Sequence, residues 1–505
     1  MNLRSSFFIF IFLLKLSTFS QASQVFKCLY QNPGEYVYSC YLIEANITNS
    51  SEPIEFINDH IEGKTSKDVK SLVTPLEEFS FPVKLELIHE QIFEEFPNIE
   101  FLYFTPGIGM KTLNLGNCAK IKEFEIYKNE IKEILNNAFI NCKNMTKISH
   151  GYCNSGSIEA GALRHLTKLE ELTITSFPTT FNHIKELLSG LTNLQKIYFD
   201  NNLLENFTTG IFNDLKKLEN LRMTNNKFTT IPAGVFDGLE NLINLDLKSN
   251  QITNLNQDSF KGLFKLDTLN LDFNYISDLS SFPFNPLTSL TDLSLIKNSF
   301  PTLPTGFFEK NTKLLSVSFS SCDIKEINTG IFDSHLSLSV ISLNNNQITS
   351  LPPDAFKNLP NLTFISFYNN SIKRLNSNSF VNLIKLDWFN IEFNQLDEIE
   401  PNFIRNFPKL RVFDARRNIC TDKYLYDMSE PYDQWFSECY YNWEYGRTTI
   451  KSSNETSTST TTEEYKSSTN NEQTSTVTTT TTVHGEILKI KVEILILLII
   501  FLNFL

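Results

Sequence analysis

The chain has 505 residues, 44 of them Phe, and a formal net charge of −13 at pH 7. This charge argues against a nucleic-acid-binding protein, because phosphate contacts require clustered Lys and Arg. The length would allow about three ordinary domains, but the sequence is periodic, and a long periodic sequence predicts one elongated array instead.

Residues 1–22 have the layout of a secretory signal peptide. Arg4 precedes an apolar run from Phe7 to Leu14, and a polar stretch with small residues follows. A transmembrane helix is the alternative, but Lys15 ends the run well before the roughly 20 apolar residues that a span requires. We therefore expect an extracellular chain, in which disulfides form and Asn-x-Ser/Thr sequences can carry glycans.

Residues 23–98 predict a non-repetitive N-terminal cap that ends in a first irregular repeat. Cys28 and Cys40 bracket two β-rich runs joined by a Pro-Gly turn. We expect a disulfide between them, because the first turn of an array would otherwise expose an apolar end and an open strand edge.

Residues 99–418 contain about 14 copies of one phrase, seen most cleanly at 242–265 as LINLDLKSNQITNLNQDSFKGLFK. Its Leu residues at positions 1, 4 and 6 predict a short strand with inward-facing side chains. The Asn at position 9, here called the marker, can satisfy buried backbone groups where the chain turns. Ten residues after the marker comes a Phe, and we expect these rings to form an apolar spine on the convex side: Phe139, Phe212, Phe236, Phe260, Phe284, Phe308, Phe332, Phe356 and Phe380.

Two early intervals in the array depart from 24 residues: Gly107 to Asn129 is two residues shorter, and one interval is a residue longer. The longer interval lies between Phe177 and Asn202, where the markers are 25 residues apart. We place the extra residue in the return segment between Phe177 and Leu188, because a slip inside the strand would turn its core side chains outward.

The chain after the last marker predicts a cap, a stalk and a tail. Residues 419–447 would form a closing cap stapled by a disulfide between Cys420 and Cys439. Residues 448–483 are rich in Ser and Thr and predict an extended, O-glycosylated stalk without a core. The short apolar end of residues 484–505 favours a GPI-attachment signal, with Ser475 as the candidate attachment residue; a single-pass helix and a secreted product are the alternatives.

The remaining cysteines occupy repeat positions. Cys118 and Cys142 hold the same position in adjacent turns, so they form a disulfide if the turns approach within about 7 Å and remain unpaired otherwise. Cys153 and Cys322 stand at marker positions, which predicts buried, unreactive thiols. Candidate glycosylation sites are Asn46, Asn49, Asn144, Asn206, Asn361, Asn369 and Asn454.

The exposed strand positions change character near the C-terminal end of the array. Val340, Phe364, Trp388 and Val412 occupy equivalent positions in four successive turns, and because strands stack about 4.8 Å apart they predict one apolar stripe. Aromatic and Arg side chains are typical of protein interfaces. The alternative is a stripe that packs laterally or under the cap. The predicted partner-binding residues are Val340, Phe364, Tyr368, Trp388, Phe393, Val412, Arg416 and Arg417.

The sequence lacks the usual catalytic motifs. It has no His-Glu-x-x-His helix, no phosphate loop and no Gly-x-Ser-x-Gly in a suitable context. We therefore do not expect an enzyme, a metal site or a cofactor.

The phrase at 242–265 resembles the leucine-rich repeat. With the caps and tail, the chain is similar to extracellular leucine-rich repeat proteins of insects, including GPI-anchored adhesion proteins of the connectin and chaoptin type; no Toll-type intracellular domain is found. The resemblance implies an α/β solenoid: a horseshoe with a parallel concave β-sheet, an irregular or short-helical convex side and disulfide-stapled caps. It also implies a cell-surface recognition or adhesion protein that binds a protein ligand, a receptor or a second copy of itself. The alternative is a secreted or matrix-associated protein of innate immune recognition.

Overall fold

The computed structural model describes most of the chain between Val25 and Tyr445. It leaves out 35–36, 48–53, 58–63, 74–82, 86–87, 89, 105–109, 111–112, 128–130, 153–155, 178–182, 334 and 427–432. The predicted signal peptide, stalk and tail lie outside the described residues, as do Asn49, Cys153, Asn454 and Ser475.

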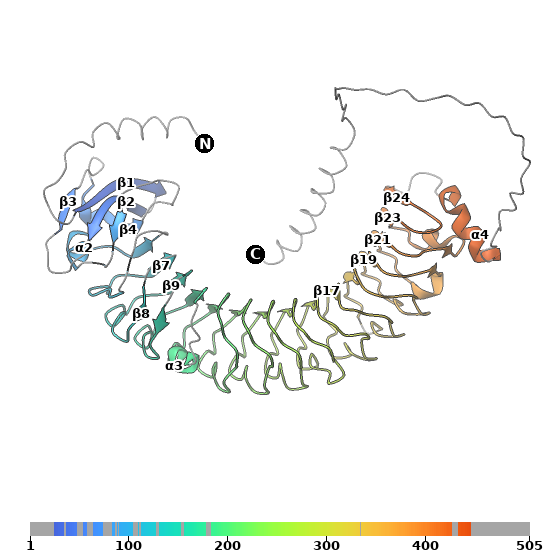
Figure 1. Ribbon diagram of the computed structural model, residues 1–505, viewed down its shortest axis with the longest axis horizontal. Helices are drawn as coiled ribbons and strands as arrows, with labels where there is room; N and C mark the ends of the chain where they lie inside the picture. The colour runs from blue at the N-terminus through green and yellow to red at the C-terminus, as the bar shows by residue number, and fades with distance from the viewer. Residues whose placement is uncertain are drawn as a thin grey trace, which may run out of the picture. The chain divides into compact units, whose positions relative to one another are not determined.

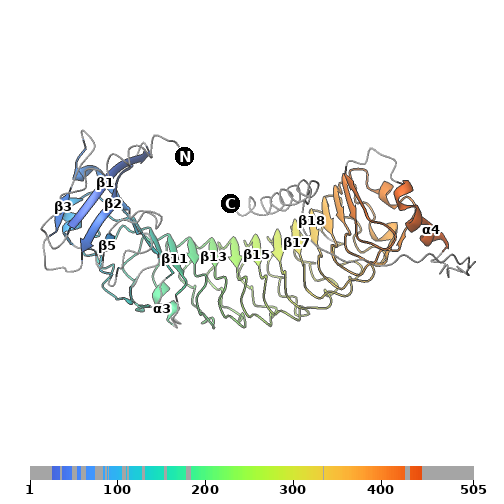
Figure 2. The same ribbon diagram turned by 45° about the horizontal axis from the view of Figure 1, so that its top comes forward.

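A parallel β-sheet lines the concave side of a curved solenoid (Figures 1 and 2). Each strand pairs in register with the strand of the next turn, so the predicted horseshoe with a concave parallel sheet is confirmed. In spatial order the strands are β4 (Val69–Val73), β6 (Phe101–Phe104), β7 (Glu123–Tyr127), β9 (Lys147–Gly151), β11 (Glu171–Thr175), β12 (Lys196–Tyr198), β13 (Asn220–Arg222), β14 (Asn244–Asp246), β15 (Thr268–Asn270), β16 (Asp292–Ser294), β17 (Ser316–Ser318), β18 (Val340–Ser342), β19 (Phe364–Ser366), β21 (Trp388–Asn390) and β23 (Val412–Ala415).

The period-2 alternation of the phrase decides which side chains form the core. Leu245, at the centre of β14, is 1% exposed, whereas Asn244 and Asp246 on either side of it are half-buried. When the turns stack, their inward leucines therefore form one continuous core, and the intervening positions lie on the concave face.

Marker side chains satisfy backbone groups between turns. The Nδ2 group of Asn274 donates to the carbonyl oxygens of Leu247 at 3.1 Å and Leu271 at 3.0 Å, and its Oδ1 accepts from the backbone N–H of Ile252 at 3.0 Å. Equivalent contacts recur at Asn226, Asn250, Asn298, Asn346, Asn370, Asn394 and Asn418.

The predicted Phe spine is confirmed, with one irregularity. All nine Phe side chains are at most 2% exposed. Rings of adjacent turns contact each other with 5.4–6.2 Å between centroids from Phe212 to Phe284 and from Phe308 to Phe380. Between Phe284 and Phe308 a further ring, Phe307, inserts at 5.5 Å and 4.6 Å.

Short elements form the convex side. The helix α3 lies in the longer interval, and Leu172 in β11 pairs with Ile197 in β12, so the extra residue falls in the return segment as predicted. The convex elements are β8 (Glu133–Ile134), β10 (Ser157–Ile158), α3 (Ile184–Leu188), β20 (Arg374–Leu375), η2 (Ser377–Ser379), β22 (Glu398–Ile399) and η3 (Phe403–Asn406).

The N-terminal cap is a disulfide-linked hairpin that continues the sheet. Strands β1 (Val25–Gly34) and β2 (Val37–Ile47) are antiparallel, and Cys28 is bonded to Cys40, the pair expected from the sequence. β2 pairs with β4, and β4 with β6, so the parallel sheet begins earlier than residue 99. The other cap elements are β3 (Glu55–Ile57), η1 (Ser66–Asp68), β5 (Val83–Leu85) and α2 (Glu90–Glu95).

The C-terminal cap adds one strand and one helix. β24 (Lys423–Tyr426) pairs antiparallel with β23, η4 (Asp433–Phe436) precedes α4 (Ser437–Tyr445), and Cys439 in α4 is bonded to Cys420. Phe436 contacts Phe413 at 5.6 Å. The cap therefore covers the apolar end of the last turn.

The remaining described cysteines, Cys118, Cys142 and Cys322, differ in whether they form a disulfide. Cys118 and Cys142 form a disulfide with a Cα separation of 4.7 Å. This separation is below the limit of about 7 Å on which the pairing depends. Cys322 is a buried free thiol whose Sγ donates to the Leu295 carbonyl at 3.0 Å. Burial raises the pKa of the Cys322 thiol to about 12, so it is unreactive, as predicted.

Candidate functional site

Val340, Phe364 and Trp388 form one row across the concave sheet. Each is the first residue of its strand and pairs in register with the next, through β18, β19 and β21. All three side chains are half-buried, and the rings of Phe364 and Trp388 stack with 6.2 Å between centroids. The row therefore leaves ordered apolar area in contact with solvent.

The prediction that Val412 continues this row as an exposed residue is wrong. Val412 is 3% exposed, because β24 lies beside β23 and places Tyr426 against it. Tyr426, 68% exposed, continues the row instead.

The two tyrosines of β24 were missed by sequence reasoning. Leu425 is buried, while Tyr424 and Tyr426 are 42% and 68% exposed, which is the alternation of a strand. The sequence Lys-Tyr-Leu-Tyr at 423–426 carries this signal, but it lies outside the repeat and so was assigned only to the cap.

Tyr368 and Phe393 form a second aromatic group just beyond β19 and β21. Their rings meet edge to face at 5.5 Å, and the guanidinium of Arg417 lies 4.1 Å from the centroid of Phe393. The Arg417 side chain is 54% exposed. This cation–π contact orders Arg417 while leaving it accessible.

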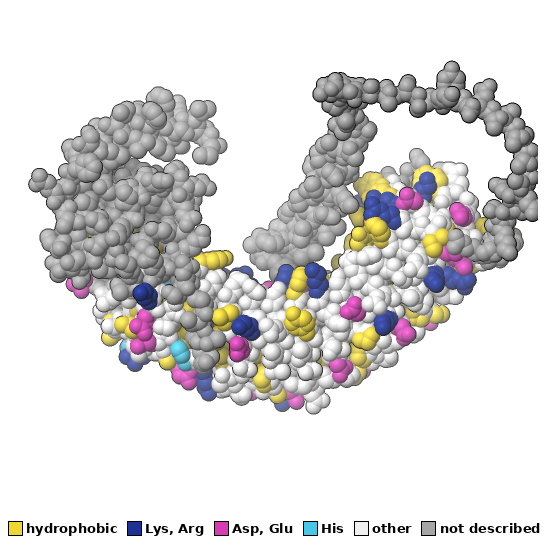
Figure 3. All heavy atoms as spheres, in the orientation of Figure 1, with side chains coloured by type: hydrophobic (Ala, Val, Ile, Leu, Met, Phe, Trp, Pro, Cys, Tyr) yellow, Lys and Arg dark blue, Asp and Glu magenta, His cyan; other side chains and the backbone are white. Residues whose placement is uncertain are grey.

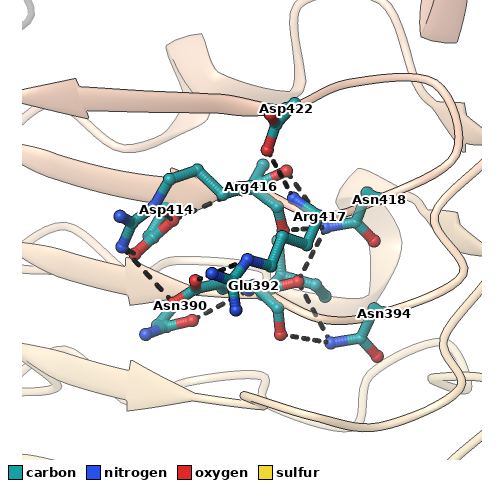
Figure 4. Close-up of polar contacts among 10 residues, drawn as sticks. Asn390, Glu392, Asn394, Asp414, Arg416, Arg417, Asn418 and Asp422 are labelled. Atoms are coloured by element: carbon teal, nitrogen blue, oxygen red, sulfur yellow. Dashed lines mark hydrogen bonds and ion pairs between the residues drawn. The ribbon is translucent and has the colours of Figure 1, made fainter. Parts of the chain in front are cut away.

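Arg416 is held by acidic neighbours (Figure 4). Its Nη2 lies 2.6 Å from Asp414 and 3.3 Å from Glu392, and the hydrogen bond to Asp414 raises the pKa of Arg416. Its guanidinium is also 5.0 Å from the Tyr424 ring centroid. Arg416 therefore orders the corner between β23 and β24, and Arg417 is the more available cation.

We call the accessible members of this region the C-terminal aromatic patch. Figure 3 shows hydrophobic and basic side chains gathered at this end of the solenoid. The patch comprises Val340, Phe364, Tyr368, Trp388, Phe393, Arg417, Tyr424 and Tyr426.

Family comparisons agree with the fold. A family described as "Leucine rich repeat" matches residues 216–276, 311–370 and 336–396, and one described as "BspA type Leucine rich repeat region (6 copies)" matches residues 71–186. Together these matches cover just over half of the chain. The chain belongs to the leucine-rich repeat proteins.

A solved structure of another leucine-rich repeat protein shares this fold. A leucine-rich repeat protein of Leptospira interrogans is 21% identical and has a TM-score of 0.55, with 68% of this chain and 83% of that chain covered. An internalin of Listeria monocytogenes is 22% identical (TM-score 0.48; 64% and 87% covered), and the Toll–Spatzle complex of Drosophila contains a chain that is 16% identical (TM-score 0.46; 77% and 58% covered). No curated protein sequence matches the chain.

In this leucine-rich repeat protein the residue before each marker from residue 153 to Asn418 has a left-handed backbone. Asn tolerates this conformation, but at Phe273 and Phe393 it costs about 1 kcal/mol and accompanies partly exposed rings. The position has φ between 53° and 58° at Tyr152, Ser176, Asn201, Asn225, Ser249, Phe273, Lys297, Ser321, Asn345, Asn369, Phe393 and Arg417. Phe393 belongs to the C-terminal aromatic patch.

Phe273 is a separate exposed aromatic that sequence reasoning missed. It is 40% exposed and lies between the ammonium groups of Lys248 and Lys297, 5.2 Å and 4.5 Å from its centroid. The sequence does carry a signal for it, because Phe273 is a large aromatic residue at a repeat position that requires a left-handed backbone.

Acidic side chains occupy the middle of the concave face. Asp200 forms an ion pair of 2.6 Å with Arg222, and Asp246 accepts a hydrogen bond from the backbone N–H of Lys248 at 3.0 Å. Burial, together with the charges of Asp200 and Asp272, raises the pKa of Asp246 to about 6.

Asp246→Asn should raise the stability of the leucine-rich repeat protein at pH 7 by about 1 kcal/mol. Because the folded-state pKa of Asp246 exceeds its unfolded value, the folded state binds more protons and stability falls as pH rises from about 4 to 6. Urea unfolding at pH 4.5 and 7 measures this fall, which the substitution should reduce.

Asp278→Asn is the control, because the pKa of Asp278 is shifted in the opposite direction. Hydrogen bonds from Ser280 lower the pKa of the exposed Asp278, so this substitution should give a small loss at pH 7 or none. A gain at pH 7 from both substitutions would point to net charge rather than to the surroundings of Asp246.

Within the described part of the chain, no group of three or more His, Cys, Asp and Glu side chains is arranged to hold a metal ion. None of the helices described between Val25 and Tyr445 has the length and apolar character that a membrane span requires.

Proposed function

We propose that this leucine-rich repeat protein is a cell-surface recognition or adhesion protein that binds a protein partner through its C-terminal aromatic patch. The observation that carries the proposal is the row Phe364, Trp388 and Tyr426, three aromatic side chains in register across the sheet. The buried Val412 of β23 lies between Trp388 and Tyr426. Accessible Trp, Tyr and Arg side chains are enriched where proteins bind each other.

The charges around the patch indicate the chemistry of the partner. Arg416 is matched by Asp414 and Glu392, whereas Arg417 reaches Glu392 only at 4.0 Å and remains largely exposed. A partner surface with apolar side chains and one acidic group fits this arrangement. A second copy of the chain fits less well, because two molecules of charge −13 repel each other.

The combined substitution Phe364→Ala, Trp388→Ala and Tyr426→Ala should lower partner capture at least tenfold, a loss of about 1.4 kcal/mol or more. Tyr426 is exposed, and Phe364 and Trp388 are half-buried on the face of the sheet rather than in the core, so the melting temperature should fall modestly and the chain should still fold. The full chain is displayed on cells and partners are identified by proximity labelling.

The matched control carries Thr268→Ala, Asp292→Ala and Ser316→Ala. These residues are the first residues of β15, β16 and β17 and lie in register with the patch row. Capture should survive in the control. Capture at the wild-type level by the patch variant would contradict the proposed surface.

We further propose extracellular attachment through a GPI anchor at Ser475. The three disulfides suit an oxidising compartment, and the short apolar tail supports the anchor. Treating intact cells with a phosphatidylinositol-specific phospholipase should release the protein. Retention until detergent is added would indicate a single-pass helix. Spontaneous release would favour the secreted or matrix-associated alternative in innate immune recognition.

The candidate glycosylation sites differ in accessibility. Asn206 and Asn369 are exposed, Asn361 is half-buried with Nδ2 donating to the Leu336 carbonyl at 2.8 Å, and Asn46 lies in β2. Asn369 directly follows Tyr368 of the patch, so a glycan there would narrow the range of partners that fit.

A further inference from the structure

A groove of about 460 Å³ lies along one edge of the sheet in the first turns of the solenoid. Its residues lie at or just before the starts of β4, β6, β7, β9 and β11, so successive turns each contribute to one continuous surface. The lining residues are Lys70, Asn98, Glu100, Lys120, Lys122, Asn144, Thr146 and Lys168.

Two of the lysines share one carboxylate. The Nζ atoms of Lys70 and Lys122 each lie 2.6 Å from an oxygen of Glu100. Hydrogen bonds from Lys122 and Lys70 lower the pKa of Glu100, so this carboxylate stays ionised at neutral pH. One negative charge therefore faces two positive charges.

The other two lysines contact neutral partners. Lys120 donates to the amide oxygen of Asn98 at 2.8 Å, and Lys168 donates to that of Asn144 at 2.7 Å. An amide orients an ammonium group without cancelling its charge. The groove thus combines four lysines with one glutamate, in a chain whose net charge is −13.

The positive charge is concentrated around Lys120. The same lysine-to-asparagine contact recurs along this edge at Lys217, Lys265 and Lys385. In these later turns, and after Lys168 in the groove, the residue two positions after the lysine is acidic, whereas Lys120 is followed at that position by Lys122. The repeat therefore builds the lysine row, and a second lysine replaces the acidic residue only after Lys120.

We propose that this groove binds a ligand that carries two or more sulfate or phosphate groups. Strands stack about 4.8 Å apart, so Lys120 and Lys168, which lie two turns apart, are separated by about 10 Å, and an extended polyanion can contact several of the lysines. Exposed ion pairs are weak, so Lys70 and Lys122 can turn from Glu100 to a multiply charged ligand.

The proposal also requires that Asn144 carries no glycan. Its Nδ2 atom, the point of attachment for an N-glycan, donates to the Ala119 carbonyl at 2.8 Å inside the groove. A glycan on Asn144 would fill the groove, so the binding form must carry an unmodified Asn144. Mass spectrometry of the peptide that contains Asn144 checks this, and full occupancy by a glycan would overturn the proposal.

The test measures binding of the full chain to a sulfated heparin hexasaccharide and to inositol hexakisphosphate at about 0.15 M salt, where long-range attraction is screened. At least one probe should bind. The combined Lys120→Gln and Lys122→Gln substitution should weaken that binding at least tenfold.

The matched control, Lys217→Gln with Lys265→Gln, removes the same charge from the same edge and should change affinity less than twofold. Binding of the hexasaccharide alone would identify a sulfated glycan as the ligand, and binding of the inositol phosphate alone a phosphorylated one. The proposal is overturned if neither probe binds, or if the groove and control variants weaken binding equally.

Discussion

Asn274→Ala should lower the free energy of unfolding by about 3 kcal/mol. The substitution leaves the buried N–H of Ile252 without its acceptor. It also removes the hydrogen bonds to the carbonyls of Leu247 and Leu271, although these carbonyls keep a second donor in Asn250 and Asn298 respectively. Buried polar groups without partners cost about 1–3 kcal/mol each, and no water can reach a position that is 4% exposed without opening the turns. Urea unfolding measures the total loss, and hydrogen exchange at Ile252 measures the local one.

Cys322→Ala provides the matched comparison at a marker position. At an Asn marker the side chain accepts a hydrogen bond from a backbone N–H of the preceding turn. At Cys322 the equivalent N–H, that of Phe300, donates instead to the Cys322 backbone carbonyl at 2.9 Å. Truncating the Cys322 side chain therefore leaves this N–H satisfied. The substitution removes the Sγ contacts to the carbonyls of Leu295 at 3.0 Å and Ser320 at 3.5 Å, and the expected cost is about 1 kcal/mol. Equal losses for Cys322→Ala and Asn274→Ala would show that the marker hydrogen bonds contribute little.

The periodic part of the fold was predictable because one physical requirement repeats in every turn. Each turn needs inward leucines, a polar side chain at the marker and a ring on the convex side, so Leu245, Asn274 and Phe260 could be placed from their spacing alone. Phe307 could not be placed in this way, since the period selects only Phe308 of the adjacent pair, although both rings are fully buried.

From the sequence, the candidate site could be predicted only as a set of equivalent repeat positions in successive turns. The spacing put Phe364 and Trp388 side by side, which the structure shows. It gave no account of β24, because that strand belongs to the non-periodic cap and pairs antiparallel. Burial of Val412 is a consequence of this pairing and therefore could not be read from the repeat. The ion pair of Arg416 with Glu392 likewise depends on a neighbouring turn.

Phe380→Ala should destabilise the C-terminal turns by about 4 kcal/mol. The Phe380 ring is 2% exposed and contacts rings from three turns, among them Phe356 at 5.4 Å, Phe389 at 5.3 Å and Phe403 at 5.6 Å. These neighbours are held by their own strands and return segments, so they cannot collapse into the cavity, which is the condition under which a large-to-small substitution costs most.

The location of this loss should follow from the architecture. Each turn contacts mainly its neighbours, so hydrogen exchange should accelerate in β19, β21 and β23 and remain unchanged in β7 and β9. The exposed Phe264 is the control, because Phe264→Ala removes a ring that is 58% exposed and should leave stability within about 0.5 kcal/mol of wild type. Faster exchange throughout the sheet would mean that the solenoid unfolds as one cooperative unit and that the spine couples all of its turns.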